Sequence, residues 1–132
     1  MNDIKPVSED AVQSLTELGR QIIEEAVNQS MEHKDEVAHH GTEARRLIES
    51  GFQFTHQMVL AAVKSGQNDL LVDQAEWAVN RLPHDSVQMP DLIKRLKRYR
   101  QSVMNHLKPD LASQVTPYLD ILIAEINSHL KT

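Results

Sequence analysis

The chain contains no cysteine among its 132 residues. Disulfide bonds, thiolate zinc sites, iron–sulfur clusters and thioether-attached haem or bilin groups are therefore excluded. Long apolar runs are absent as well, since no segment approaches the roughly 18–20 apolar residues that a membrane-spanning helix needs. The first residues, Met1 to Pro6, lack the basic and apolar regions of a secretory signal. We therefore expect a cytoplasmic protein that does not enter a membrane.

Glycine and aromatic residues are also scarce. The sequence has four glycines, five prolines and 4% aromatic residues, while 40% of its residues are hydrophobic. No long β-branched alternation indicates a strand, whereas apolar residues recur at helical spacing almost throughout. A chain of this length can bury roughly two-thirds of its unfolded surface in one core. We therefore predict one all-α domain over residues 1–132, a compact bundle of about five helices.

Local signals place the first helix and the three that follow. After a tail over residues 1–7, Ser8 is a good N-cap for a helix that reaches about Met31. A second helix is predicted over about 43–64. A third ends near residue 82, and a connecting loop over 83–89 leads to a fourth helix that starts at Pro90.

Proline also shapes the end of the chain. Pro109 is expected to end the fourth helix, and the fifth is expected to restart near Thr116 and Pro117. Loops this short favour antiparallel neighbours. The sequence leaves open whether the helices pack as a simple bundle or as a globin-like sandwich.

The second predicted helix is apolar on nearly every side. We predict that it is central, because a helix of this kind is normally surrounded by neighbours. One stripe is expected to form its main apolar face, and further apolar residues lie around it. The stripe is Leu47, Gly51, Phe54, Met58 and Ala62, and the others are Phe52, Val59, Leu60 and Val63.

Basic residues gather between Pro90 and Lys108. This segment carries a net charge of +5, so the rest of the chain must carry −10. The helical wheel places Lys94, Lys97 and Arg98 on the solvent side of the fourth helix. They are interpreted as a solubilising face or as a docking face for an acidic partner. Nucleic acid is not favoured, because aromatic residues are not interleaved with the basic ones.

A groove is predicted around three other residues. Arg100 lies beside apolar positions of the wheel, so its guanidinium is expected to need a carboxylate partner or an anionic ligand. Trp77, the single tryptophan, lies off the main stripe of its helix. Together with Tyr99, these residues are predicted to form a ligand-binding or partner-binding groove, with simple core packing as the alternative.

Histidines offer a rival interpretation. His56 is predicted to be shielded in the central helix, where it is either a packed core histidine, a pH switch or a ligand for haem or another tetrapyrrole. If their segment is helical, His33, Glu36 and His40 share a face and form a candidate metal site. The Glu-x-x-His spacing of di-iron bundles occurs once, at Glu36, and such sites need a second copy.

No catalytic constellation is found. The chain has no glycine-rich phosphate loop, no cysteine nucleophile and no serine motif with a plausible base. We therefore predict that the protein is not an enzyme and has no catalytic residues.

Features over residues 54–130 follow an order known from one group of proteins. The segments that carry it are 56–63 (HQMVLAAV), Ser65-Gly66, 76–78 (EWA), Pro90 with 92–100 (LIKRLKRYR), and 117–120 (PYLD). In this order the chain resembles helical input domains of bacterial sensory regulators. These are the N-terminal domains of stressosome RsbR-type proteins and the helical segment ahead of cobalamin-binding domains.

The resemblance implies a sensor or interaction module for signal transduction, often dimeric and sometimes globin-like without haem. It supplies no catalytic residues. Cobalamin binding is not carried over, because no part of the chain resembles a Rossmann-type cobalamin domain. We therefore predict a non-catalytic signal-input domain that acts through a protein partner or a homodimer, with a small-molecule ligand possible. The alternative is a haem-binding or metal-binding helical bundle.

Overall fold

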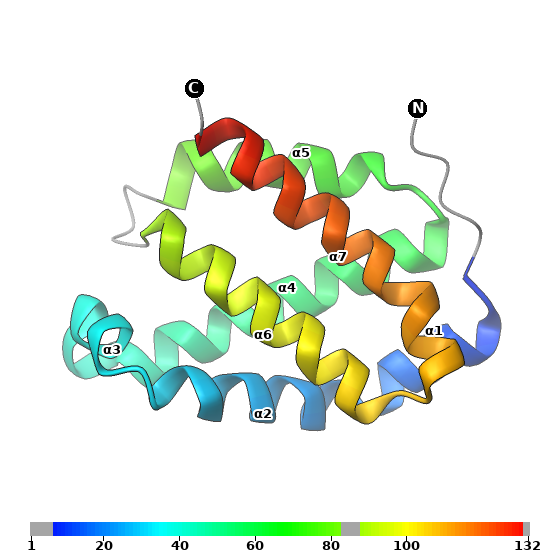
Figure 1. Cartoon of the computed structure of the whole chain (residues 1–132), viewed down its shortest axis with the longest axis horizontal. Helices are drawn as coiled ribbons and strands as arrows, with labels where there is room; N and C mark the ends of the chain where they lie inside the picture. Colours follow the sequence, from blue (N-terminus) through cyan, green and yellow to red (C-terminus); the bar gives the residue numbers. More distant parts are fainter. Residues whose placement is uncertain (1–6, 83–87, 131–132) are drawn as a thin grey trace.

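Every element of the structure is helical in the part of the chain that it describes, residues 7–82 and 88–130 (Figure 1). This computed structural model confirms the predicted all-α bundle. Within those ranges, no helix is long and apolar enough to cross a bilayer. The elements are α1 (Glu9–Glu17), α2 (Gly19–Met31), α3 (Lys34–His40), the 3-10 turn η1 (Gly41–Glu43), α4 (Ala44–Ser65), α5 (Asp69–Arg81), α6 (Met89–His106) and α7 (Pro109–Leu130).

The predicted first helix is divided in two. Its N-cap is as expected, because the Ser8 hydroxyl accepts a hydrogen bond from the Ala11 N–H at 3.2 Å. At Leu18, however, α1 ends and α2 begins, with φ −94° and ψ 3° at that residue. The break directs α2 along α4 and α6, with Gly19 buried against His56.

The two proline predictions had different outcomes. Pro109 does separate the last two helices, since α6 ends at His106 and α7 begins at Pro109. The predicted restart near Pro117 is wrong, because α7 runs through it without interruption. Proline has no N–H, so the Ser113 carbonyl loses its helical hydrogen bond there. Most of the predicted 83–89 loop falls on 83–87, outside the described residues, and α6 already includes Met89.

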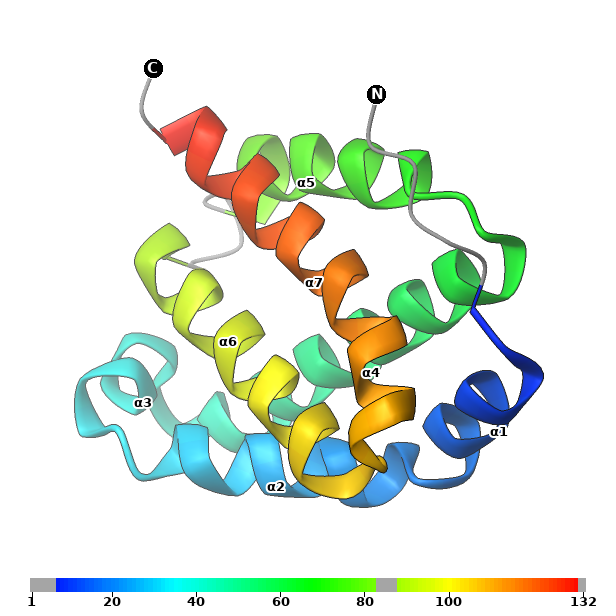
Figure 2. The same ribbon diagram turned by 45° about the vertical axis from the view of Figure 1, so that its right-hand side comes forward.

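The helices are arranged in layers, with α6 and α7 in one layer and α4 behind them. In both views α6 and α7 lie side by side and cross in front of α4 (Figures 1 and 2). α4 contacts α1, α2, α3, α5 and α7, so the prediction that this helix is central is confirmed. α4 ends at Gly66, whose left-handed φ of 69° suits glycine, and from that turn α4 and α5 diverge (Figure 2).

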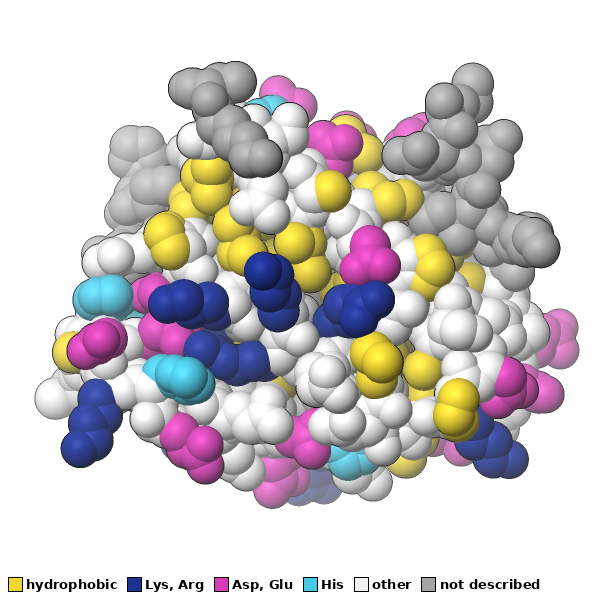
Figure 3. Space-filling view, viewed as in Figure 1, with side chains coloured by type: hydrophobic (Ala, Val, Ile, Leu, Met, Phe, Trp, Pro, Cys, Tyr) yellow, Lys and Arg dark blue, Asp and Glu magenta, His cyan; other side chains and the backbone are white. Residues whose placement is uncertain are grey.

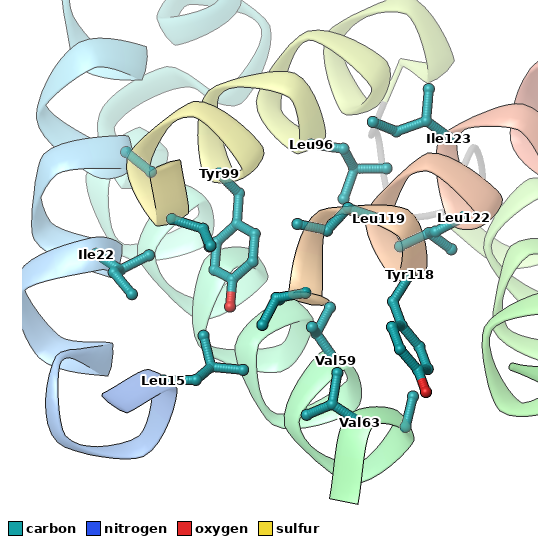
Figure 4. Close-up of a cluster of buried hydrophobic side chains, with 14 of the residues drawn as sticks. Leu15, Ile22, Val59, Val63, Leu96, Tyr99, Tyr118, Leu119, Leu122 and Ile123 are labelled. Atoms are coloured by element: carbon teal, nitrogen blue, oxygen red, sulfur yellow. The ribbon is translucent and has the colours of Figure 1, made fainter. Parts of the chain in front are cut away.

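The core forms where these helices meet. Tyr99 reaches inward from α6 and Tyr118 from α7, and aliphatic side chains surround both rings (Figure 4). Both tyrosines are fully buried. The face of α4 that enters this core carries Ile48, Phe52, Val59 and Val63, and of the predicted stripe only Ala62 is buried there.

Candidate functional site

An apolar cavity of about 490 Å³ lies between α4 and α5. α6 and α7 contribute further walls, and one residue comes from α3. This volume is in the range of small-molecule sites. The wall is mostly aliphatic and aromatic, and it is formed by His40, Leu47, Ile48, Ser50, Gly51, Phe52, Phe54, Thr55, Met58, Gln74, Trp77, Ala78, Leu82, Leu92, Arg95, Leu96, Leu122 and Ile126.

The predicted main stripe of α4 lines this cavity. Leu47, Gly51, Phe54 and Met58 all contribute to its wall. The sequence pattern therefore identified a real apolar face, most of which lines the cavity. The reason is that α5 diverges from α4, so this face of α4 is not covered by a neighbouring helix over its full length. Leu47 is left 39% exposed as a result.

Two aromatic rings meet across the cavity from opposite helices. Phe54 of α4 and Trp77 of α5 have ring centroids 5.9 Å apart, with their planes tilted by 38°. They remain 47% and 46% exposed. Aromatic side chains exposed beside an apolar hollow are typical of binding sites. The prediction placed Trp77 at a groove, and Trp77 does line this cavity.

Two of the residues in the cavity wall, His40 and Arg95, are hydrogen-bonded to each other. The Arg95 Nη2 donates a hydrogen bond to His40 Nε2 at 2.9 Å, and the Arg95 residue is only 8% exposed. Burial, followed by the positive charge of Arg95, lowers the pKa of His40 below its ordinary value. His40 is therefore neutral at pH 7.

Arg95 belongs to a larger polar cluster that joins α3 to α6. At its centre is Glu36, which is 3% exposed and accepts two hydrogen bonds from Arg98, at 2.9 and 2.6 Å. Arg98 also donates to the Ser30 hydroxyl at 3.1 Å, and the Arg95 Nε lies 3.4 Å from Glu36 Oε1. A second link joins the two helices, because His39 Nδ1 and Asp91 Oδ2 are 2.6 Å apart.

Opposing effects determine the pKa of Glu36. Burial alone would raise it, but the hydrogen bonds and charge of Arg98, with the charges of Arg95 and His33, outweigh burial and hold the pKa below its ordinary value. Glu36 is thus an ionised carboxylate shared by two guanidinium groups. The Glu36 carboxylate is held firmly, because its removal would leave the guanidinium groups of Arg95 and Arg98 buried without their shared counter-charge.

These contacts change the interpretation of the predicted metal residues. Glu36 is engaged by arginine, His40 faces Arg95, and His33 Nδ1 lies 4.0 Å from Glu36 Oε2. No group of three or more potential metal ligands comes together anywhere in the described ranges. The arrangement therefore supports a structural ion-pair cluster at the end of α3.

His56 is packed between two other helices. Its Nδ1 is 2.6 Å from the Tyr99 hydroxyl, and its other ring nitrogen faces Gly19, where an added Cβ would lie 2.4 Å from Nε2. Burial lowers the pKa of His56. With one nitrogen hydrogen-bonded and the other against backbone, the geometry favours a core histidine over a haem ligand.

The predicted groove of Trp77, Tyr99 and Arg100 does not form. Tyr99 is fully buried beside His56, because it faces the core formed with α2 and α4. Arg100 extends over α7 instead, and its Nε donates to Asp120 at 2.7 Å. The carboxylate partner expected for Arg100, with an anionic ligand as the alternative, is therefore found in Asp120.

The basic face of α6 is only partly as predicted. Lys94 and Lys97 are exposed, and lysine and arginine side chains gather over α6 on the visible face in Figure 3. The prediction that Arg98 points to solvent is wrong, since its side chain is 14% exposed and holds Glu36. The helical wheel could not anticipate this, because α3 covers that side of α6.

Sequence reasoning missed Phe54 and Arg95 as site residues. The signal for Phe54 was present, because α4 has two apolar faces and packing against the core needs only one of them. Arg95 gave no comparable signal, because it looks like any other cation in the basic segment. A comparison with protein-family models and one with curated protein sequences both found no match.

Proposed function

We propose that the protein is a non-catalytic signal-input domain that binds a small apolar molecule in the cavity between α4 and α5. The observation that supports this most is the cavity itself, about 490 Å³ in volume and lined mainly by α4, α5, α6 and α7. Its walls are mostly apolar and include a few polar side chains, which is the usual composition of a ligand site.

The position of the cavity suits a sensory role. Its walls come mainly from α4, α5, α6 and α7, so a bound ligand would contact several helices at once. A ligand shifts a conformational equilibrium only by its difference in affinity for the two states. Filling the space between diverging helices is a direct source of such a difference. The resulting change in helix packing is the signal that we propose is passed to a partner protein or a second copy of the chain.

Trp77 allows a direct test, because it is the single tryptophan and lines the cavity. Purified protein is titrated with decan-1-ol, a neutral apolar probe, while Trp77 emission is recorded. We expect a saturable blue shift, since a bound alkyl chain removes water from the indole ring. No saturable change with this probe would contradict the proposal.

A blocking variant makes the test specific. Gly51 lines the cavity, and a Cβ added there meets nothing within 4 Å. Gly51→Leu should therefore fill the cavity and abolish the titration. It should not reduce thermal stability, because glycine is about 1 kcal/mol less favourable than other residues inside a helix. Gln53→Leu, two residues away on α4, exposed and outside the cavity wall, is the matched control and should bind as wild type does.

A second experiment separates a small-molecule site from a protein interface. If the exposed rings of Phe54 and Trp77 instead bind a second chain, the protein will associate with increasing concentration. Sedimentation velocity over a wide concentration range would then show dimers that Phe54→Ala disrupts. This result, together with no effect of decan-1-ol, would assign the surface to protein association.

A further inference from the structure

We propose that the cavity between α4 and α5 selects an uncharged ligand, an apolar molecule whose carboxamide head group pairs with the side-chain amide of Gln74. This inference rests on the function proposed above and specifies its ligand class. It is carried by the polar side chains of the cavity wall that still have hydrogen-bonding capacity. Apart from the indole of Trp77, the polar side chains in the wall are those of His40, Ser50, Thr55, Gln74 and Arg95.

Three of these side chains are already engaged within the protein. Arg95 donates a hydrogen bond to His40 at 2.9 Å, and its guanidinium Nε lies 3.4 Å from the carboxylate of Glu36. The remaining ring nitrogen of His40 is buried beneath the wall. The Thr55 hydroxyl donates to the Gly51 carbonyl at 2.9 Å. These three side chains therefore offer a ligand no unmatched charge.

The other two side chains are uncharged and unengaged. Neither the Gln74 amide nor the Ser50 hydroxyl has a hydrogen-bond partner in the described part of the chain. Gln74 is partly buried on α5, one helical turn before Trp77. Its side chain offers N–H donors beside a carbonyl acceptor. A carboxamide has the same two functions side by side, so it can donate to Gln74 and accept from it at once, whereas an ester can only accept.

A charged head group is not matched by this wall. A carboxylate or an ammonium that reached Gln74 would leave water without meeting a counter-charge, which costs free energy. Charged side chains do line the shallow hollow next to the cavity that Trp77 also borders, but these residues, Asp73, Glu76 and Arg81, are exposed to water. Contacts between exposed charges contribute little. The wall therefore favours an uncharged ligand over an ion of either sign.

Four probes of similar length test the proposal. Decanamide, decanoate, decylamine and hexylbenzene are titrated at pH 7, below the concentrations at which they aggregate, with Trp77 emission as the signal. We expect decanamide to bind about tenfold or more tightly than decanoate and decylamine. The reason is that each ion must either leave water without a counter-charge or keep its head group outside the cavity. Hexylbenzene has no polar atom and reports on the apolar cavity alone.

Substitution of Gln74 identifies the residue responsible. Gln74→Leu should weaken decanamide binding by roughly three- to tenfold, which is the usual contribution of a hydrogen bond between uncharged groups. Binding of hexylbenzene should be unchanged or tighter, and it shows in the same sample that the variant is folded. Gln53→Leu is the matched control, since it makes the same change at an exposed position of α4 outside the cavity wall.

A charge at the same position locates the head group. Gln74→Glu keeps the approximate shape of the side chain and supplies a counter-charge for a cation. Decylamine should therefore bind this variant about threefold or more tightly than it binds the wild type, and decanoate should bind more weakly. Gln53→Glu adds the same charge outside the cavity wall and should change neither affinity.

Each failure has its own meaning. If decanoate or decylamine binds the wild-type protein as tightly as decanamide does, the preference for an uncharged ligand is overturned. A decanamide affinity that is unchanged in Gln74→Leu would overturn the placement of the head group. In both cases, binding of hexylbenzene would leave the apolar site of the proposed function standing. No saturable change with any of the four probes would contradict the proposed function as well.

Discussion

The two buried tyrosines differ in the environment of the hydroxyl group. Both are fully buried, and burial raises the pKa of each above its ordinary value. The Tyr99 hydroxyl is bonded to His56 at 2.6 Å, whereas the Tyr118 hydroxyl has no hydrogen-bond partner within the described ranges. The same chemical change should therefore have different effects at the two sites.

We predict that Tyr99→Phe lowers the free energy of unfolding by roughly 1–3 kcal/mol, because it leaves the buried imidazole of His56 without its partner. Tyr118→Phe should be neutral or stabilising, since it removes a buried hydroxyl that makes no hydrogen bond. Urea unfolding of both variants measures the difference. Equal destabilisation of the two would contradict this assignment of roles.

Single residues also show where sequence-based prediction ends. That His56 is shielded followed from the apolar residues around it on its helix, and this was correct. Its contact with Gly19 had no local signal, because a glycine inside a predicted helix can have several causes. Only the tertiary structure reveals that a side chain at position 19 would collide with the imidazole ring.

At the scale of elements, α3 is the piece whose attachment depends most on charge. Seven residues long, it contributes one buried residue, Glu36, and that residue is charged. An isolated helix of this length is not stable in water. Its position therefore depends on the Glu36 and Asp91 links to α6.

We predict that Glu36→Gln lowers the free energy of unfolding by about 3 kcal/mol, because Arg95 and Arg98 would remain buried without their shared counter-charge. Amide hydrogen exchange should also show α3 opening more often than in the wild type. Glu43→Gln is the matched control. The Glu43 side chain is 59% exposed in its ion pair with Arg46, so the effect should stay within about 0.5 kcal/mol. A loss at position 36 no larger than this would show that α3 does not depend on the buried charge.

The all-α class and several helix boundaries were predictable, because they depend on local signals such as Ser8, Pro109 and the apolar period, whereas the break at Leu18 and the separate helix α3 were not predicted. The directions of side chains on a helix were less predictable. Arg98 was assigned to solvent, but its side chain is mostly buried against Glu36, and Leu47, assigned to the main apolar face of its helix, is 39% exposed at the cavity. A helical wheel gives angles around one axis, but it does not say which angles face a neighbour, an open cavity or water.

At the scale of the whole molecule, stability should fall as the pH falls below neutral. His40 and His56 both have pKa values below the ordinary 6.5 in the folded protein. Between the folded and unfolded pKa values, the unfolded chain binds protons that the folded chain does not, so acid favours unfolding. Glu36 adds a second loss at lower pH: its folded pKa is depressed, so its contribution is present above the unfolded value of 4.5 and disappears as the pH falls through the folded pKa.

Urea unfolding at a series of pH values from 7.5 to 4 would check this prediction, with histidine ring signals followed by NMR to assign each step. We expect the free energy of unfolding to decrease continuously over the range. His56→Gln should reduce the slope just below pH 6.5. A constant or rising stability between pH 7.5 and 5.5 would contradict the prediction.

Pro117 interrupts the backbone hydrogen bonds of α7. On one side of it, the Gln114 Oε1 accepts a hydrogen bond from the Ser8 N–H at 2.7 Å, and this bond connects that half of the helix to the residue that caps α1. On the other side, Leu122 and Ile126 form part of the cavity wall. Bending is easiest where a backbone hydrogen bond is missing. If the cavity binds a ligand as proposed, we expect α7 to bend at Pro117, so that the end of the helix that carries Leu130 moves relative to the half that is held by Ser8.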